Sequence, residues 1–359
     1  MMKKLSVSEI NKLLDKESAL VKSKEIEQLH RQKYILVTGG AGSIGSELVR
    51  QICLFSPKKI VVLDQGETPL HQLSLNLSND FPNVEIDYIL SDVSDPNRLE
   101  QIFQQYRFDI VYHAAAYKHV PIIEKNPYEG VKVNILGTKI LAEFSSQYEV
   151  EKFVLISTDK AVNPVSVMGA TKRVAELIIQ YFQRKNGNKT KFITTRFGNV
   201  LGSNGSVVFR FMEQVENRQP ITITHPEITR YFMSISESCR LVLQSVAIGK
   251  GGEICVFDMG EPIKIVDLAK KIGQAYGVEI GKDIDLIFTG LRDGDKIEEE
   301  LFNASEKVDF TQDKIMFSNS LNLNFEKIKF IIEEFQRKFH EEKNTDWKNY
   351  LKTILKDFN

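Results

Sequence analysis

The segment that decides the fold is residues 33–47, which read "KYILVTGGAGSIGSE". It opens with a short apolar run typical of a buried parallel strand, and helical spacing begins directly after the glycines. Gly39, Gly42 and Gly45 have the GxxGxxG spacing of a loop whose backbone approaches a pyrophosphate at a helix N-terminus. For the glycines alone, a tight structural turn is the alternative. Between a strand and a helix, they predict a dinucleotide-binding loop.

A carboxylate follows the second apolar run, where Asp64 stands in "VVLDQGE". At this position a carboxylate accepts hydrogen bonds from the ribose hydroxyls of NAD. It would repel the 2′-phosphate of NADP, and no arginine follows directly, so NAD is favoured. The alternative is that Asp64 only caps the next helix. Asp92, in "SDV", is expected close to the adenine ring.

Apolar runs and helical segments alternate over the first 200 residues. Strands are expected within residues 33–40, 59–64, 84–93, 109–116, 151–158 and 191–200. Helices are expected near 97–105, 127–146 and 168–185. This alternation predicts an α/β fold with a Rossmann-like, doubly wound parallel sheet, whose ligands bind beyond the carboxyl ends of the strands.

The pattern changes after Val200, where turn residues become more frequent. We expect an N-terminal helical arm over residues 1–32, with a short helix from about Val7 to Leu14. A nucleotide-binding domain is expected over residues 33–203, with 233–259 returning to it. Residues 204–232 and 260–359 are expected to form a smaller C-terminal substrate-binding lobe, which makes the cleft between the two parts the default site.

Composition narrows the possible partners and compartments. The 359 residues carry a net charge of −1, so charge gives no reason to expect binding to nucleic acid or anionic membranes. Cys53, Cys239 and Cys255 form no CxxC pair and are expected to be buried thiols in a reducing compartment. No signal peptide, membrane span or metal motif is visible, so a cytoplasmic protein without a metal is expected.

The residues that carry chemistry lie in "STDKAVNPVSVMGATKR", residues 157–173. Thr158, Asp159 and Lys160 end the fifth strand and are expected to face the cleft, although an Asp-Lys pair elsewhere would be read as a surface ion pair. Met168 and Lys172 are spaced i, i+4 on the next helix, which allows Lys172 to reach a nicotinamide ribose. Short-chain dehydrogenases place a tyrosine four residues before this lysine. A methionine, usually core filler, cannot replace its proton chemistry.

Several motifs together resemble the extended short-chain dehydrogenase/reductases, and within them the UDP-N-acetylglucosamine 4,6-dehydratases. They are "VTGGAGSIGSEL", "AAAYKHVPIIE", "VNILGT", "STDKAVNPVSVMGATKR", "RFGNVLGSNGSVV", "TRYFMSISE", "GGEICVFDMGEP" and "GLRDGDKIEEEL". The resemblance covers about Leu13 to Leu301. Met168 in place of tyrosine resembles the configuration-retaining branch of that family rather than the C5-inverting branch.

The resemblance implies a reaction in which NAD takes hydride from C4 of the sugar, water leaves from C5 and C6, and the hydride returns to C6. Lys160 would be the base at C5, Asp159 the acid for the leaving hydroxyl, and Thr158 a partner of the C4 hydroxyl. This assignment requires a lowered pKa at Lys160 and a raised pKa at Asp159. The group that deprotonates the C4 hydroxyl stays open between Asp159 and a water chain.

The same resemblance implies two sets of binding residues. Cofactor contacts are expected from Gly39, Gly42, Ser43, Ile44, Gly45, Asp64, Asp92, Val93, Ala114, Ala115, Ala116 and Lys172. Contacts with the UDP-sugar are expected from Lys118, Asn199, Ser206, Arg230, Arg292 and either Glu299 or Glu300. Each charged residue could instead form an ordinary surface ion pair. Asp293, Asp295 and His225 depart from the commoner family spelling, which affects substrate selectivity more than reaction class.

Three alternative functions stay open at this level. A 4-epimerase or a C5-inverting dehydratase would share the fold, but both normally rely on the missing tyrosine. A catalytically dead NAD-binding regulator would explain the missing tyrosine, but the intact Thr158-Asp159-Lys160 run argues against it. Association into a homodimer or larger homo-oligomer is expected from the resemblance.

Overall fold

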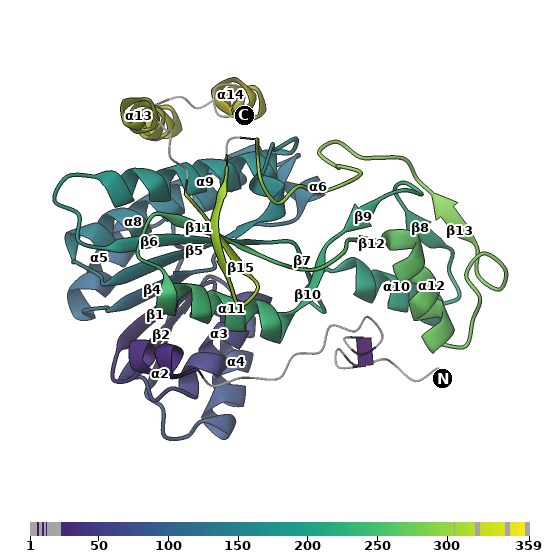
Figure 1. Cartoon of the computed structure of the whole chain (residues 1–359), viewed down its shortest axis with the longest axis horizontal. Helices are drawn as coiled ribbons and strands as arrows, with labels where there is room; N and C mark the ends of the chain where they lie inside the picture. The colour runs from purple at the N-terminus through teal and green to yellow at the C-terminus, as the bar shows by residue number, and fades with distance from the viewer. Residues whose placement is uncertain are drawn as a thin grey trace.

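The central feature of the computed structural model is a nine-stranded sheet with helices on both faces (Figure 1). The structure describes residues 6, 9–10, 12, 23–304, 306–319, 324–341 and 345–355. Across the sheet the strand order is β14-β15-β11-β6-β5-β4-β1-β2-β3. In chain order these strands are β1 Tyr34–Thr38, β2 Lys59–Asp64, β3 Ile86–Leu90, β4 Ile110–His113, β5 Lys152–Thr158, β6 Lys191–Phe197, β11 Glu253–Phe257, β14 Val308–Gln312 and β15 Ile315–Asn319.

The strand order confirms the predicted doubly wound sheet. Every neighbouring pair from β3 to β11 is parallel, and the chain moves outward from β1 in one direction to β2 and β3 and in the other to β4, β5 and β6. The carboxyl ends of β1, β2, β4 and β5 therefore meet at one edge of the sheet, on both sides of the point where the order reverses.

Helices cover the two faces of the sheet because successive strand residues point to opposite sides. In β1, Leu36 packs into one hydrophobic cluster, while Ile35 and Val37 pack into the other. The first cluster includes α5 Pro96–Gln105, the π-helix Val131–Gly137, α8 Thr138–Gln147 and α9 Val167–Arg184. The second includes α2 Lys24–His30, α3 Ser43–Cys53, α4 Glu67–Asp80 and α11 Ile235–Ile248.

Shorter helices connect these elements. α6 Val120–Ile123 and α7 Pro127–Gly130 follow β4, and the π-helix joins α7 directly to α8, so the helix expected near residues 127–146 is continuous. Among the described residues, no helix is both long and apolar enough to cross a membrane. Cys53, Cys239 and Cys255 are buried and unpaired with one another.

A smaller lobe with its own hydrophobic core stands beside the sheet (Figure 1). It contains α10 Val207–Glu216 and α12 Ile265–Ala275 and the short strands β7 Asn199–Leu201, β8 Ile221–Ile223, β9 Thr229–Arg230, β10 Phe232–Ser234, β12 Ile263–Lys264 and β13 Leu286–Phe288. Ile10 is fully buried in this core, so the N-terminal arm touches the lobe. The rest of the helix expected from Val7 to Leu14 lies largely outside the described residues.

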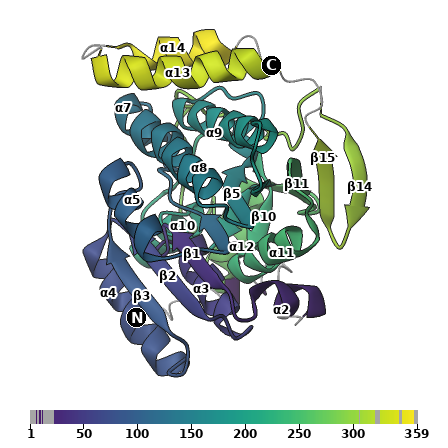
Figure 2. The ribbon, with the colours of Figure 1, turned by 90° about the vertical axis from the view of Figure 1, so that its left-hand side faces the viewer.

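The C-terminal segment departs from the expected domain boundary, because it packs on the main sheet rather than on the smaller lobe. β15 pairs antiparallel with β11, and β14 with β15. α13 Phe325–Glu341 and α14 Trp347–Leu355 lie against α9 (Figures 1 and 2). The reason is an apolar stripe, including Ile331, Phe335 and Trp347, that joins the cluster under α9. Abundant lysine and glutamate conceal this stripe in the sequence.

A buried group of four charged side chains, called here the Arg196 network, ties the chain after the smaller lobe to the sheet. It comprises Arg173 and Glu176 of α9, Arg196 of β6, and Glu306. The Arg196 guanidinium donates to both oxygens of Glu176, at 3.2 and 2.8 Å, and to both oxygens of Glu306, at 2.7 and 3.1 Å. Arg173 donates to both carboxylates as well. Arg196 is fully buried, so these pairs are shielded from water.

Replacement of Glu176 by Gln tests the contribution of the Arg196 network. Breaking a buried ion pair by removing one partner costs about 3–5 kcal/mol, because the remaining charge is left uncompensated. We expect Glu176→Gln to lower the free energy of unfolding by that amount in denaturant titrations. Glu333→Gln, an exposed change on α13, is the control and should stay within about 0.5 kcal/mol of wild type. A loss below about 1 kcal/mol at position 176 would contradict the assignment.

The Arg196 network also predicts how the stability of the folded protein changes at acidic pH. Burial raises the pKa of Glu176, but the Arg196 and Arg173 guanidinium groups and the Ser157 hydroxyl lower it to about 2. A carboxyl whose pKa is depressed in the folded state stabilises that state above its ordinary pKa of 4.5. Stability should therefore fall as pH drops from about 4.5 through about 2, and this fall should be smaller in Glu176→Gln.

Candidate active site

The glycine loop between β1 and α3 is shaped by contacts that leave no space for side chains. Gly39 has φ +63°, and a Cβ there would lie 2.6 Å from the Ala115 backbone. A Cβ on Gly45 would lie 2.1 Å from the carbonyl oxygen of Gly39. Gly42 differs, because a Cβ there would meet only the Gly39 oxygen, at 3.2 Å, within 4 Å. Gly39 and Gly45 thus close the loop, whereas the Cα of Gly42 borders free space.

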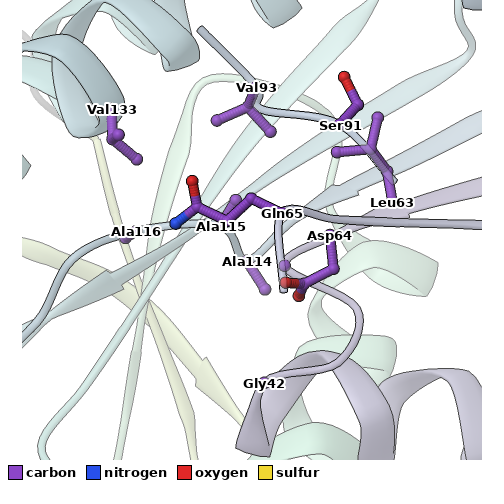
Figure 3. A pocket seen from close by; sticks show the side chains of 11 residues that line it. Gly42, Leu63, Asp64, Gln65, Ser91, Val93, Ala114, Ala115, Ala116 and Val133 are labelled. Atoms are coloured by element: carbon purple, nitrogen blue, oxygen red, sulfur yellow. The ribbon is translucent and has the colours of Figure 1, made fainter. Parts of the chain in front are cut away.

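That free space is a pocket at the carboxyl ends of β1, β2 and β4, called here the loop pocket (Figure 3). Its walls include the predicted cofactor residues Gly39, Gly42, Asp64, Val93, Ala114, Ala115 and Ala116. Sequence reasoning missed four further wall residues: Leu63, Gln65, Ser91 and Val133. Leu63, Gln65 and Ser91 lie next to predicted positions, and Val133 lies on the π-helix. None of these residue types indicates a ligand-binding position in a sequence by itself.

Asp64 lies in the pocket wall and also holds the surrounding backbone. Its Oδ2 accepts a hydrogen bond from the Ala41 N–H at 2.9 Å, and its Oδ1 accepts one from the Gly66 N–H at 2.9 Å. Gly66 immediately precedes α4. The carboxylate therefore holds the glycine loop and the start of α4 in place while it also forms part of the pocket wall.

Asp92 is not part of the pocket wall, and the expected adenine contact stays a prediction. Its Oδ1 accepts bonds from the Ser94 N–H and hydroxyl, and its Oδ2 pairs with Lys132 at 3.0 Å. Burial raises the pKa of Asp92, but the hydrogen bonds from Ser94 and the charge of Lys132 lower it by more. The pKa of Asp92 is therefore below its ordinary value. A carboxylate with these partners organises its own loop, and the neighbouring Ser91 and Val93 form the wall instead.

Two predicted cofactor residues at the start of α3 have other contacts. The Ser43 hydroxyl accepts a hydrogen bond from the Asn204 N–H at 3.0 Å, which links α3 to the "GSNGSVV" loop of the smaller lobe. The side chain of Ile44 packs against the second hydrophobic cluster. Neither residue lines the loop pocket.

Five polar side chains meet beyond the carboxyl end of β5, and we call them the charge cluster: Asp159, Lys160, Asn199, Arg230 and Glu299. The Lys160 ammonium donates to Asp159 Oδ1 at 2.9 Å and to Asn199 Oδ1 at 3.1 Å. It lies 3.6 Å from Glu299 Oε1, and the Arg230 Nε lies 3.6 Å from the same oxygen. The Thr158 hydroxyl donates to Asp159 Oδ1 at 2.9 Å.

The expected lowering of the Lys160 pKa is wrong for the protein without ligands. Burial does lower this pKa, but the Asp159 and Glu299 carboxylates raise it by more, and Arg230 opposes them only in part. Lys160 is therefore held as an ammonium ion between two acidic partners. Because Glu299 lies far from Lys160 in the sequence, its effect could not be predicted from the Asp-Lys pair alone.

Met168 and Lys172 occupy the first turns of α9, which Ser166 caps by accepting a hydrogen bond from the Gly169 N–H. The Met168 side chain is only 3% exposed and packs in the first hydrophobic cluster, so it also fills core space. Lys172 is 4% exposed. Burial lowers its pKa to about 8, although Glu176 acts in the opposite direction.

A second pocket lies within the smaller lobe and is called here the lobe pocket. Of the predicted substrate residues, Asn199, Arg230 and Arg292 line it. The other wall residues are Val207, Arg210, Phe211, Thr222, Ile223, Thr224, Ile228, Ile265, Thr289 and Asp295. Arg210 is the charged residue that sequence reasoning missed. It donates to Thr222 at 2.9 Å, and only its place on the α10 face toward β8 identifies it.

The remaining predicted substrate residues lie outside both pockets. Glu299 belongs to the charge cluster, and Glu300 is exposed and bonded to Asn163 and Lys296. The expected ribose contact of one of these glutamates stays a prediction. Lys118 is exposed between β4 and α6. The Ser206 hydroxyl oxygen, at the start of α10, is buried without a hydrogen-bond partner in the described chain.

Comparison with known proteins finds matches over most of the chain. Residues 35–320 match the family model described as polysaccharide biosynthesis protein. The chain is 48% identical to the capsular polysaccharide biosynthesis protein CapD of Staphylococcus aureus over 83% of its length, and it spans 50% of that protein. It is 34% identical to the inverting UDP-N-acetylglucosamine 4,6-dehydratase of Campylobacter jejuni, over 77% of this chain and 80% of that protein.

A solved structure agrees with these relatives. The X-ray structure of Pen from Bacillus thuringiensis superposes with a TM-score of 0.73 at 29% identity, over 82% of this chain and 89% of that chain. The fold is therefore that of the extended short-chain dehydrogenase/reductases. Among the described residues, no group of three or more histidine, cysteine or acidic side chains could hold a metal ion.

Lys172 gives a prediction about stability. Its pKa of about 8 in the folded protein is below the ordinary 10.5, so folding penalises the charged form. Lys172→Met should raise the free energy of unfolding at pH 7 by about 1–3 kcal/mol. In the wild type, stability should rise between about pH 8 and 10.5, because the unfolded chain binds more protons there. The variant should lack this rise.

The matched control is Lys270→Met, at an exposed position of α12, which should change stability by less than about 0.5 kcal/mol. Denaturant titrations at pH 7 and pH 10 give the free energy of unfolding of each variant and its change with pH. If Lys172→Met proves less stable than wild type at pH 7, the lysine contributes a favourable interaction and the account of its burial is wrong.

Proposed function

The chain belongs to the polysaccharide biosynthesis protein family, and from that membership we propose that it dehydrates UDP-N-acetylglucosamine in an NAD-dependent reaction. The product is UDP-2-acetamido-2,6-dideoxy-4-keto-hexose with the configuration at C5 retained. The observation that carries the proposal is the pairing of Asp159 and Lys160 at the carboxyl end of β5, beside Asn199 and Arg230 of the lobe pocket.

The loop pocket fits NAD. A Cβ on Gly42 would project where the backbone has to approach a pyrophosphate, and the N-terminus of α3 supplies free N–H groups there. Asp64 in the wall favours ribose hydroxyls over a 2′-phosphate. NAD held there would supply the hydride chemistry for oxidation at C4 and reduction at C6 of the sugar. Lys172, on α9, is proposed to bind the nicotinamide ribose.

The lobe pocket is proposed to bind the UDP moiety. Arg210 and Arg292 bring guanidinium groups to its wall, and guanidinium forks suit phosphate oxygens. Thr222, Thr224 and Thr289 add hydroxyl groups, which can bond a uracil or a ribose. The charge cluster shares Asn199 and Arg230 with this pocket, so a sugar attached to bound UDP can extend toward Lys160.

Asp159 and Lys160 can supply the acid and the base together. In the ligand-free protein they form an ion pair at 2.9 Å. A bound sugar would exclude water from this pair, and desolvation favours the neutral forms of both groups. Transfer of one proton along the existing hydrogen bond then gives a neutral amine and a neutral carboxylic acid. The amine removes the C5 proton, which the C4 ketone acidifies, and the acid protonates the C6 hydroxyl as it leaves.

Thr158 and Met168 complete the proposal. The Thr158 hydroxyl already lies in the hydrogen-bond chain that ends at Asp159, and it is proposed to orient the C4 hydroxyl. Met168 offers no proton-transfer group, which supports the retaining reaction over an epimerase or an inverting dehydratase.

A homo-oligomeric state and a cytoplasmic location stay predictions. Because α13 and α14 cover α9, an oligomer could not assemble on that helix face without displacing them.

The first test is product analysis. Incubation with UDP-N-acetylglucosamine should give a 4-keto sugar whose C6 is a methyl group, observed by NMR. Lys160→Ala and Asp159→Asn should each lower kcat at least about 100-fold, the scale of positioned acid–base catalysis. Both should still bind UDP-N-acetylglucosamine and NAD. Lys125→Ala, an exposed change beyond the cluster, should keep wild-type kcat. A product that keeps its C6 hydroxyl would exclude dehydration.

The second test concerns the missing tyrosine. If Asp159 and Lys160 suffice, Met168→Tyr should not increase kcat for dehydration, because no step then waits for a phenol. The measurement is the initial rate of 4-keto sugar formation, with thermal unfolding as a check on folding. A large increase in kcat would show that the acid–base pair alone is incomplete.

A further inference from the structure

Two carboxylate oxygens next to Lys160 are buried and have no hydrogen-bond partner in the described chain: Asp159 Oδ2 and Glu299 Oε2. The Asp159 side chain is fully buried, and that of Glu299 is 3% exposed. A buried acceptor without a donor costs about 1–3 kcal/mol. Native proteins keep such groups rarely, and often at functional sites. Asp159 already has a role in the proposed reaction, whereas Glu299 has none.

Glu299 is held in place by backbone contacts on both sides. Before it, the Arg230 guanidinium donates to the carbonyl oxygens of Lys296, at 2.8 Å, and Ile297, at 3.1 Å. After it, Arg196 donates to the carbonyl oxygen of Leu301 at 3.1 Å. The carboxylate is thus fixed at the charge cluster by its backbone rather than by its own hydrogen bonds.

The contacts of Glu299 itself are one-sided. Its Oε1 lies 3.6 Å from both Lys160 Nζ and Arg230 Nε, which is close enough for charge interaction but longer than a good hydrogen bond. Its Oε2 has no hydrogen-bond partner in the described chain. An ion pair formed for stability alone would direct both oxygens to the adjacent guanidinium, which prefers bidentate geometry. One oxygen is therefore left for a donor that the protein chain does not supply.

We propose that Glu299 is a sugar-binding residue of the reaction centre, whose Oε2 accepts a hydrogen bond from a hydroxyl or amide N–H of the hexose while its Oε1 fixes Lys160. This inference rests on the proposed function, and it replaces the ribose contact expected from the sequence. The ligand class follows from chemistry, because a buried carboxylate oxygen needs a neutral or cationic donor, and a UDP-linked hexosamine brings neutral donors next to Lys160.

The position of Glu299 also sets the charge around Lys160. The charged groups that face Lys160 are Asp159 on its own turn, Glu299 on the segment after the smaller lobe, and Arg230 on β9. Asn199 of β7 adds a neutral acceptor. Without the Glu299 charge, Asp159 is the one remaining carboxylate in this group that raises the pKa of Lys160, and Arg230 still lowers it. The pKa of Lys160 should therefore fall. If Lys160 must be neutral to act, the rise of kcat/KM with pH should then occur at lower pH.

The deciding experiment compares UDP with UDP-N-acetylglucosamine as calorimetric ligands. Glu299→Gln should weaken UDP-N-acetylglucosamine binding about tenfold or more, the loss expected for a charge-assisted hydrogen bond, and leave UDP binding unchanged. Glu298→Gln, an exposed neighbour, should change neither. Unchanged binding of UDP-N-acetylglucosamine by Glu299→Gln, or equal losses for both ligands, would overturn the proposal.

A second variant separates the effect of the Glu299 charge from the effect of its side-chain length. Glu299→Asp keeps the charge but shortens the side chain, so it should weaken UDP-N-acetylglucosamine binding while the pH dependence of kcat/KM stays at its wild-type position. Glu299→Gln should move that dependence to lower pH. If Glu299 had a purely structural role, the pH dependence of kcat/KM would stay at its wild-type position in both variants. That result would contradict the proposal. If the wild type binds UDP-N-acetylglucosamine but forms no 4-keto product, the proposed function fails, and the calorimetry still decides the role of Glu299.

Discussion

The Arg196 network is the constraint on which the active site depends. Arg196 is fully buried in β6, and it bonds both Glu176 of α9 and Glu306 of the segment that follows the smaller lobe. Taking these charges out of water is costly, and only their mutual pairing makes it tolerable. The network therefore brings three remote parts of the chain together in one arrangement.

The consequences reach the chemistry directly. The anchored segment carries Glu299 to Lys160, and the anchored helix α9 carries Met168 and Lys172. The loop pocket is built by close backbone packing of glycines, while the lobe pocket is built by side chains of α10, α12 and the short strands. Beside the lobe pocket, Lys160 pairs with the fully buried Asp159, and one oxygen each of Asp159 and Glu299 has no hydrogen-bond partner in the described chain. This site is costly to fold and suits a reaction that needs a proton donor and a proton acceptor side by side.

Sequence reasoning reached the features that local patterns determine. The alternation of apolar runs and helices predicted the sheet. The glycines and Asp64, together with the family resemblance, predicted most of the loop-pocket wall. Features that depend on distant residues were missed. Glu299 adds to the effect of Asp159 in raising the pKa of Lys160, and Arg210 forms part of the wall of the lobe pocket. The C-terminal helices were assigned to the wrong part of the fold because their apolar stripe is diluted by lysine and glutamate. The pairing of Asp92 with Lys132 was also missed, because Lys132 lies on another element.

The central claim is that Asp159, Lys160 and Glu299 surround the carbons that lose water. A crystal structure of Lys160→Ala with NAD and UDP-N-acetylglucosamine tests it most directly. The account predicts that C5 of the hexose faces residue 160, that the C6 oxygen lies within about 3 Å of the Asp159 carboxylate, and that a sugar donor reaches Glu299 Oε2. A hexose bound with C5 and C6 beyond hydrogen-bond reach of all three positions would contradict it.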